Sequence, residues 1–509
     1  QALALLWKAL GWHPEDAPVE NEGADAGWPP FPRVDVRWDE ATCGQVVYLF
    51  SETQNNFAGR PEEFFDVMRR RPCEGPKTLT VASIDIGGGT TDLVVNDYRL
   101  EGRGSNVYIL PEQRFRDGFK VAGDDILLEV IQAVLVPALR DALRDSGVSD
   151  PDPLLSRLIG TDPVEVQESV LRQQLALQIM YPAGLSVLKE YEGYDPTSGA
   201  AVRSCSLGAL LQGADPPTEK VLRHFADGVR TYSEASLEAF ALLEVPVGLD
   251  LDRLQRRFMT DRLEICRSIR SLCEIVHLYN CDVLLLTGRP SRLPGIRSLF
   301  RALLPLSPDR NLTRHDFRAG PWYPFNKQGR VDDPKTTAAV GAMLCVLGQG
   351  RLPNFFFRAN ALRSYSTVRY VGLLDQNMII KAENVYFGDV DLDNPDYELP
   401  DLPLEMRGVM HLGYRQLAVD RWGASPLYVL DFADEEARER LYREDGGVFL
   451  VYLEQVRGAD AERFKVKRIE TSSGRAVRKT AVTLKLNTLT DIGLGDDSHW
   501  LDSGSVFRI

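Results

Sequence analysis

Apolar and polar positions follow two alternating patterns along the chain. Residues 79–86 and 91–97 are strand-like apolar runs separated by a glycine-rich turn, and residues 106–110 predict a third strand. From about residue 123 to 280 the apolar positions recur at helical spacing, with Pro137 expected to kink the first helix. The short, continuously apolar run 281–288 is typical of a buried strand. These patterns predict an α/β fold with a large helical insertion.

The flanking regions differ in character. Upstream, the pattern predicts a helix over 2–12, a strand over 33–38, a helix over 39–50 and an inserted loop over 53–77 that carries a short amphipathic piece, 61–70. Helices are expected over 294–304 and 332–348. After residue 351 alternating strands dominate (366–374, 425–432, 447–456 and 480–489), with one helix over 434–444. We therefore expect a β-rich domain at 351–509 that folds as a separate module.

The turn between the first two strands carries the clearest chemical signal. Gly87, Gly88 and Gly89 cost backbone entropy, so a geometric reason for them is expected. Successive N–H groups in such a turn form a nest for phosphate oxygens, and Thr90 and Thr91 add hydroxyl donors. Asp85 and Asp92 flank the turn and would repel an anion unless a cation such as Mg²⁺ lay between them. A glycine-rich hairpin by itself is more often structural, so its neighbours decide the interpretation.

Four further segments stand in an order that supports the phosphate interpretation. They are the helix start 39–48, the segment 121–125, the loop 284–294 (LLLTGRPSRLP) and the helix 333–342. Together with 85–92, this order resembles the actin, Hsp70 and sugar-kinase ATPase superfamily, most closely its Hsp70-type branch. The resemblance implies an actin-like (ribonuclease H-like) ATPase lobe. Residues 1–78 would be the end of a first lobe, and 79–350 a second lobe with a mainly helical insertion at 126–280.

The resemblance also implies ATP and Mg²⁺ as cofactors and a role for each matching residue. Asp85 would hold the hydrated Mg²⁺, and Glu40 would polarise the attacking water, with Asp92 as an assisting carboxylate. The phosphates would meet Gly87, Gly88, Gly89, Thr90 and Thr91; Gly288 and Arg292 would contact the nucleoside, and Gly341 would allow a close helix crossing at the hinge. Simpler interpretations stay open: Glu40 as a helix-start acid, Asp92 as a turn cap and Arg292 as a surface charge.

Two departures from the family pattern matter. No strand–turn–strand with an Asp and a Gly-Thr turn precedes residue 39, so we expect the chain to be a C-terminal fragment of a larger protein. The adenosine-loop segment reads Gly288-Arg289-Pro290 where the family has paired glycines and a small residue. Arg289 would either cover the base or obstruct it, so phosphate binding is better supported than nucleotide identity.

Composition narrows the classes of function. The 509 residues carry a net charge of −14, which argues against non-specific binding to nucleic acid or an anionic membrane. No run of about 18 apolar residues predicts a membrane span. Seven cysteines without a CxxC pair, and no signal peptide, favour the cytoplasm. The acidic run 389–400 lacks the glycine and glutamate of a calcium loop, and no histidine pair or GxSxG motif appears.

The β-rich region and the inserted segment TQNNFAGRPEEFF resemble the bacterial virulence-factor family called SrfB. Two functions remain open. The first is a slow ATPase that acts as a conformational switch on a protein partner through the C-terminal domain, and the second is a nucleotide-binding scaffold or assembly subunit without useful turnover. Glu40 and Asp92 favour the switch, and the altered adenosine loop favours the scaffold. A metabolite kinase is less well supported, because no motif marks a sugar or acid pocket.

Overall fold

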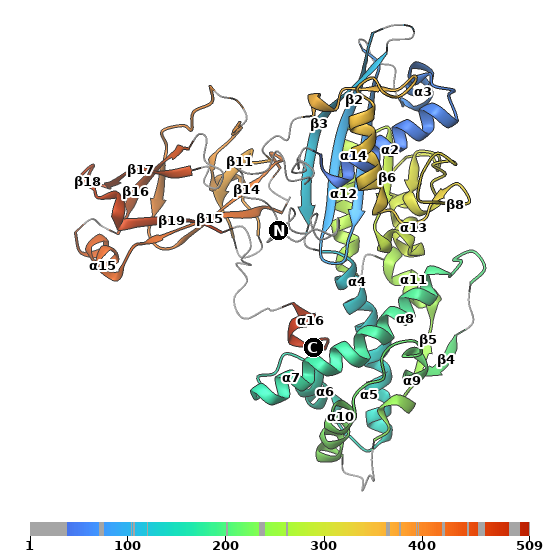
Figure 1. The fold of residues 1–509 in the computed structure, drawn as a ribbon. Helices are drawn as coiled ribbons and strands as arrows, with labels where there is room; N and C mark the ends of the chain where they lie inside the picture. The colour runs from blue at the N-terminus through green and yellow to red at the C-terminus, as the bar shows by residue number, and fades with distance from the viewer. Residues whose placement is uncertain are drawn as a thin grey trace, which may run out of the picture.

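The computed structural model shows a central sheet, a helical region below it and a β-rich region to one side (Figure 1). It describes residues 38–70, 76–102, 104, 107–119, 121–199, 202–233, 240–260, 263–362, 367–375, 378–392, 394, 396–419, 423–444, 447–456, 464–487 and 499–507. The predicted helix over 2–12 lies outside the described residues, as does nearly all of the predicted strand over 33–38.

The central sheet has six strands in the order β10-β3-β2-β1-β6-β7. The first three strands along the chain form an antiparallel meander, and β6, β7 and β10 join it in parallel. Their bounds are β1 (Thr78–Ile86), β2 (Thr91–Glu101), β3 (Tyr108–Phe119), β6 (Val283–Thr287), β7 (Asn311–Thr313) and β10 (Phe356–Phe357). Strand β3 extends beyond the predicted range 106–110 to Phe119. The sequence pattern indicates a shorter strand because Pro111 interrupts the alternation of apolar residues. Strand β10 pairs only with Tyr108 and Ile109, so the outer edge of β3 tolerates a proline beyond them.

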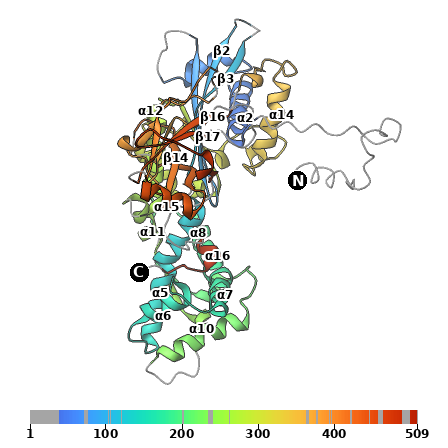
Figure 2. The ribbon, with the colours of Figure 1, turned by 90° about the vertical axis from the view of Figure 1, so that its left-hand side faces the viewer.

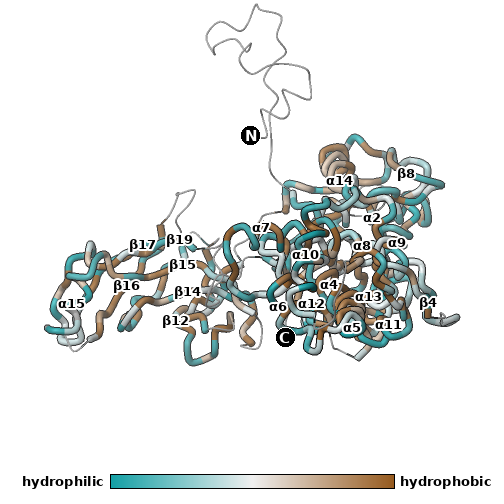
Figure 3. The backbone as a smooth tube through the Cα atoms, turned by 90° about the horizontal axis from the view of Figure 1, so that it is seen from below, coloured by the Kyte–Doolittle hydropathy of each residue, from teal (hydrophilic) through white to brown (hydrophobic). Residues whose placement is uncertain are grey.

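Alternating side chains of the sheet build two separate cores. On one face, Leu79 and Val81 of β1 pack with the helices α2 (Glu40–Asn55), α3 (Pro61–Met68) and α14 (Thr336–Leu347). On the other face, Ala82 and Ile84 pack with α12 (Glu264–Leu278) and α13 (Pro294–Leu303). Figure 3 shows apolar stretches along α13 and α14, the helices that lie on opposite faces. This sandwich fixes the ends of β1, β2 and β6 relative to one another.

The helical region begins at the sheet with α4 (Gly123–Val130) and continues the core of the second face. Pro137 follows a π-helical turn, Ile131–Leu135, which leads into α5 (Val136–Asp145). A second π-helical turn, Ala176–Met180, precedes Pro182 in the same way. Proline lacks the N–H group that the preceding turn needs, and the backbone widens there. The other helices are α6 (Pro151–Ile159), α7 (Val166–Leu175), α8 (Tyr181–Glu192), α9 (Leu207–Leu210), α10 (Glu219–Tyr232) and α11 (Leu251–Met259).

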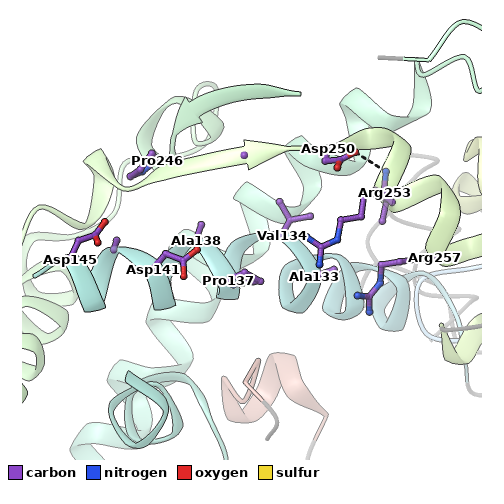
Figure 4. Close-up of a pocket in the computed structure, with 13 residues that line it drawn as sticks. Ala133, Val134, Pro137, Ala138, Asp141, Asp145, Pro246, Asp250, Arg253 and Arg257 are labelled. Carbon is purple, nitrogen blue, oxygen red and sulfur yellow. Dashed lines mark hydrogen bonds between the residues drawn. The ribbon is translucent and has the colours of Figure 1, made fainter. Parts of the chain in front are cut away.

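Sequence periodicity misses a short antiparallel pair in this region, β4 (Arg203–Ser206) with β5 (Pro246–Leu249). A hollow of about 310 Å³ lies between α5, β5 and α11. Figure 4 shows Asp141 and Asp145 towards one end of this hollow and Arg253 and Arg257 towards the other. None of the residues predicted from the sequence to bind a ligand lines it.

The β-rich region has a core of its own, built by a five-stranded and a four-stranded sheet. The first has the order β12-β11-β14-β15-β19 and the second β13-β16-β17-β18. The strands are β11 (Tyr370–Leu373), β12 (Val385–Phe387), β13 (Pro403–Met406), β14 (Met410–Arg415), β15 (Ser425–Phe432), β16 (Phe449–Gln455), β17 (Phe464–Thr471), β18 (Ala476–Val477) and β19 (Val482–Leu486). The helix α15 (Glu435–Glu444) falls where the sequence predicts it.

Two segments from residues 351–509 belong to other parts of the fold, which corrects the predicted domain boundary. Strand β10 lies in the central sheet, and Phe355 and Phe357 are buried in its core. The C-terminal helix α16 (Trp500–Ser503) packs beside α7, and Phe507 is buried in the helical region (Figures 1 and 2). Within the described residues, no helix has the length and apolar character to cross a membrane.

Candidate functional site

A cleft of about 870 Å³ opens where the ends of β1 and β6 meet the helical region. One wall comes from the turn after β1, the loop after β6, the start of α2 and residues 332–335 before α14. The opposite wall comes from α4 and α8. The cleft brings together eight residues predicted from the sequence: Glu40, Asp85, Gly87, Gly88, Thr90, Asp92, Gly288 and Arg292.

Asp85 and Asp92 face each other as register partners at the tip of the β1–β2 hairpin. Burial, and next the nearby Glu40 carboxylate, raise the pKa of Asp85 to about 6, although the Arg314 guanidinium acts in the opposite direction. The pKa of Asp92 is also raised, because burial outweighs the opposing effect of the Thr90 hydroxyl. That hydroxyl lies 3.3 Å from a carboxylate oxygen of Asp92. A half-buried carboxylate whose neighbours are also acidic is stabilised by a cation. Asp85 is therefore a carboxylate whose charged form a bound cation would stabilise.

The glycine turn, which we define as Gly87–Thr90, is held from below by the start of α4. The N–H groups of Gly123 and Asp124 donate to the carbonyl oxygens of Gly87 and Gly88 at 2.9 and 2.8 Å. The N–H of Gly87 closes the turn by donating to the Thr90 carbonyl at 2.8 Å. The backbone N–H groups of Gly88, Gly89 and Thr90 donate to no acceptor in the described part of the chain. Three successive donors thus remain available to an anion.

None of the three glycines has a positive φ, so a left-handed backbone does not explain them. A Cβ atom at Gly88 would lie 3.6 Å from the Asp124 carboxylate, and one at Gly89 would meet no atom within 4 Å. The turn is therefore uncovered, with Gly88 and Gly89 both exposed. Gly89 adjoins the cleft without lining it.

Thr91 corrects one expectation from the sequence. Its side chain is fully buried, and its hydroxyl donates to the Val121 carbonyl at 2.7 Å. Adjacent residues of a strand point to opposite faces of the sheet, so Thr90 lines the cleft and Thr91 does not. Thr91 anchors the segment that leads into α4, and its hydroxyl is not available to a phosphate.

Gly288 has a positive φ of +82°, and its neighbours leave no room for a side chain. A Cβ atom there would lie 1.9 Å from the Ile86 carbonyl oxygen and 2.8 Å from a carboxylate oxygen of Asp85. This packing is sufficient reason for the glycine, whether or not a nucleoside also approaches it. The loop after β6 therefore presses directly on the acidic end of β1.

Two arginines of the same loop have partners within the protein. Arg292 contacts the His315 ring nitrogen Nδ1 at 2.8 Å. Arg289 forms an ion pair of 3.1 Å with Glu192 of α8. Both Arg289 and Glu192 line the cleft, so this ion pair joins its two walls. Arg289, which the sequence suggests would cover or obstruct a base, is thus held at the rim.

Glu40 is the first residue of α2, and its position follows from local capping. The Asp39 carboxylate accepts from the Thr42 N–H at 2.7 Å and from the Thr42 hydroxyl at 2.9 Å, which starts the helix at residue 40. Glu40 is exposed and lines the cleft. Gly341 does not line the cleft. It lies on α14 where that helix crosses α2, and a Cβ atom there would lie 2.0 Å from the Cys43 carbonyl oxygen.

Sequence reasoning missed several charged residues of the site. Seven carboxylates line the cleft (Glu40, Asp85, Asp92, Asp124, Glu192, Asp332 and Asp333), with four lysines and arginines (Lys189, Arg289, Arg292 and Lys335). Asp124 belongs to the segment 121–125, for which the sequence predicts no binding role. Arg314, close behind the cleft wall, lies in none of the sequence motifs. Its one signal is Gly44, because a Cβ atom there would overlap the Arg314 guanidinium.

The described residues contain no group of three or more His, Cys, Asp or Glu side chains that could hold a metal ion. Mg²⁺ in phosphate sites usually keeps several waters and takes only one or two carboxylates, with the rest of its shell from the phosphates. Asp85 lines the cleft at the end of β1, beside the glycine turn, and is the carboxylate that would hold such an ion.

Comparison with known proteins gives one family. No curated protein matches the chain significantly. The family model described as virulence factor SrfB matches residues 1–507. The match covers nearly the whole chain, including the sheet, the helical region and the β-rich region. The protein therefore belongs to the SrfB virulence factor family.

Proposed function

We propose that this SrfB-family protein binds a magnesium–nucleoside triphosphate, most simply ATP, in the cleft and uses it as a conformational switch on a protein partner. The observation that carries the proposal is the glycine turn: three successive N–H groups, which have no acceptor among the residues that the structure describes, lie beside the half-buried Asp85. Backbone donors of this kind hold phosphate oxygens without adding positive charge. The switch would operate in the cytoplasm and needs no nucleic acid.

The charge of the cleft explains why a metal would be required. Carboxylates outnumber lysines and arginines in its lining, so a bare triphosphate would be repelled. A divalent cation held by Asp85 and the phosphates would reverse that repulsion. When bound, Mg²⁺ would neutralise charge on the phosphates; the protein would hold them at the turn, and Glu40 would orient a water molecule.

The arrangement of elements supports an actin- or Hsp70-like lobe. The glycine turn, the loop after β6 and the start of α2 converge on one end of the sheet. Helices α2 and α14 cross at Gly341, where only a glycine fits. The helical region forms the second wall of the cleft, so its position relative to the sheet would respond to the ligand. The β-rich region, with its own core, would carry the contact with the partner.

A scaffold without useful turnover is the second candidate, and the Arg289–Glu192 ion pair favours it. This pair joins the loop after β6 to α8 across the rim of the cleft. A pair that held the walls together would slow exchange of the ligand and favour a stably bound state. Hydrolysis measured with Arg289→Ala beside the wild type separates the two functions, because only a switch gains turnover when exchange becomes faster.

Calorimetry with Mg²⁺–ATP tests the binding step directly. Gly88→Val places methyl groups against Asp124 and over the turn, so we expect at least about a tenfold loss of affinity, equivalent to roughly 1.4 kcal/mol. Gly89→Ala is the matched control, because its Cβ atom enters open space and its N–H is retained. Circular dichroism should show both variants folded. Equal affinity of Gly88→Val and wild type would reject the phosphate site.

A further inference from the structure

Arg314 is a buried cation behind the cleft. It begins the short 3₁₀ turn Arg314–Asp316, directly after β7, and its side chain is only 4% exposed. One guanidinium nitrogen, Nη1, donates to the Thr337 hydroxyl of α14 at 2.5 Å. The second terminal nitrogen, Nη2, is buried and has no hydrogen-bond acceptor among the described residues. A guanidinium in this state is unfavourable unless nearby negative charge compensates it.

The fold makes specific room for this side chain. A Cβ atom at Gly44 of α2 would lie 1.3 Å from the Arg314 Nη2 atom. Helix α2 thus contacts the guanidinium at a residue without a side chain, one turn after Glu40. Arg314 is therefore enclosed by α2, α14 and the end of β7. Strand β7 runs parallel to β6, and β6 runs parallel to β1, so Arg314 follows β7 at the same end of the sheet at which Asp85 lies on β1.

Two carboxylates of the cleft act most strongly on this cation. Burial lowers the pKa of Arg314, whereas Asp85 raises it most and Glu40 next. In the other direction, Arg314 is the strongest positive influence on Asp85. These are the two residues to which the proposed function assigns the metal and the attacking water.

We propose that Arg314 is the resident counter-cation of the cleft, balancing Asp85 and Glu40 in the ligand-free protein and making the site select a metal–phosphate complex over a free divalent ion. The inference rests on the proposed function. A free Mg²⁺ meets carboxylates whose charge is already offset and is repelled by the guanidinium. A magnesium–triphosphate complex carries net negative charge, so the same guanidinium attracts it. Arg314 acts through Asp85 and Glu40 and is a positioning residue.

The test uses Mg²⁺ alone, with no nucleotide present. Binding is followed by calorimetry and by the change in melting temperature in wild type, Arg314→Gln and Arg314→Lys. Removing the charge should tighten the binding of free Mg²⁺ by at least about tenfold. Arg314→Lys retains the charge and should bind free Mg²⁺ as weakly as wild type does. A purely structural arginine would give two destabilised variants with no change in affinity for Mg²⁺.

A double variant keeps the test decisive if Arg314→Gln folds poorly. Asp85→Asn removes the carboxylate that the guanidinium compensates, so Arg314→Gln/Asp85→Asn should fold better than Arg314→Gln and lose the tightened Mg²⁺ binding. Failure of both variants to fold, even with Mg²⁺ present, would overturn the inference, as would unchanged Mg²⁺ affinity in a folded Arg314→Gln. Because ATP is absent, these outcomes are separate from the Gly88→Val test of nucleotide binding.

Discussion

Gly288 and Ile86 are in direct backbone contact: a Cβ atom on Gly288 would lie 1.9 Å from the Ile86 carbonyl oxygen. This contact connects the loop after β6 to the end of β1, next to Asp85. It shows that one glycine which resembles a nucleoside-binding residue is already required by the packing of the protein. Stability and ligand binding must therefore be measured separately at this position.

Gly288→Ala should destabilise the protein by about 2–4 kcal/mol, because an alanine is strained at φ +82° and its methyl group collides with backbone that cannot easily move. Chemical denaturation gives the difference. Gly408→Ala is the control, since its Cβ atom meets nothing within 4 Å. A Gly288→Ala variant as stable as wild type would mean that the loop after β6 is not held against β1.

Glu40→Ala separates chemistry from binding. If Glu40 orients the attacking water, its removal slows ATP hydrolysis by about 10²-fold or more while Mg²⁺–ATP affinity changes little. The fold should be unaffected, because the Glu40 side chain is exposed and Asp39, not Glu40, caps α2. Single-turnover kinetics and calorimetry on one preparation provide both quantities. Equal turnover in mutant and wild type would favour the scaffold.

Glu129 of α4 should make stability depend on pH. Burial raises its pKa from 4.5 to about 7, although its carboxylate accepts the Glu264 N–H at 2.6 Å. Between these values the folded protein binds more protons than the unfolded chain, so the unfolding free energy falls as the pH rises from about 4.5 to 7. The loss is complete above that window.

Glu129→Gln keeps the acceptor for Glu264 and removes the charge. We expect it to be more stable than wild type by about 1 kcal/mol at pH 8, after allowing for solvent screening, and equally stable near pH 4. Denaturation curves across this range measure the difference. Glu219→Gln, at a side chain that is 83% exposed, is the control and should follow wild type. Parallel curves for Glu129→Gln and wild type would contradict the assignment.

The sequence predicts elements well where one local pattern dominates. The β1–β2 hairpin, α13 and the strand β15 lie within a few residues of their predicted bounds, because alternation, an initial proline or a glycine turn determines each one locally. Strand β5 escaped prediction because only four residues form it, within a region where helical spacing dominates.

The site was harder to predict, since its chemistry depends on contacts between distant segments. Whether Thr90 or Thr91 faces the cleft depends on strand alternation and on the Val121 carbonyl, 30 residues away. Arg314 belongs to no motif, and its environment comes from α2 and α14 folding around it. The burial of Phe507 is also a tertiary event, because its contacts with Ile159 and Arg140 lie more than 300 residues upstream.

The C-terminal segment makes the β-rich region less separable than its composition indicates. The N–H of Phe507 donates to the Ile159 carbonyl at 2.7 Å, and the Gln132 side chain donates to the Val506 carbonyl at 3.1 Å. Trp500 and Phe507 are each 3% exposed. At the other end of the region, Phe357 is buried beside β3. Each buried aromatic side chain contributes roughly 1.5–3 kcal/mol.

Cutting the backbone at a protease site inserted after Arg351 should therefore leave two pieces that stay together. We expect them to co-elute in size-exclusion chromatography, because β10 and residues 499–507 remain buried in the partner piece. Trp500→Ala/Phe507→Ala in the cut protein should release part of the C-terminal piece, which still folds around its own core. Leu402→Ala/Val409→Ala, at side chains that are 50% and 53% exposed, should leave the pieces associated. Separation of the pieces without any substitution would show that β10 and the C-terminal segment do not hold the β-rich region to the rest of the protein. Contacts between the β-rich region and a partner could then form independently of the cleft.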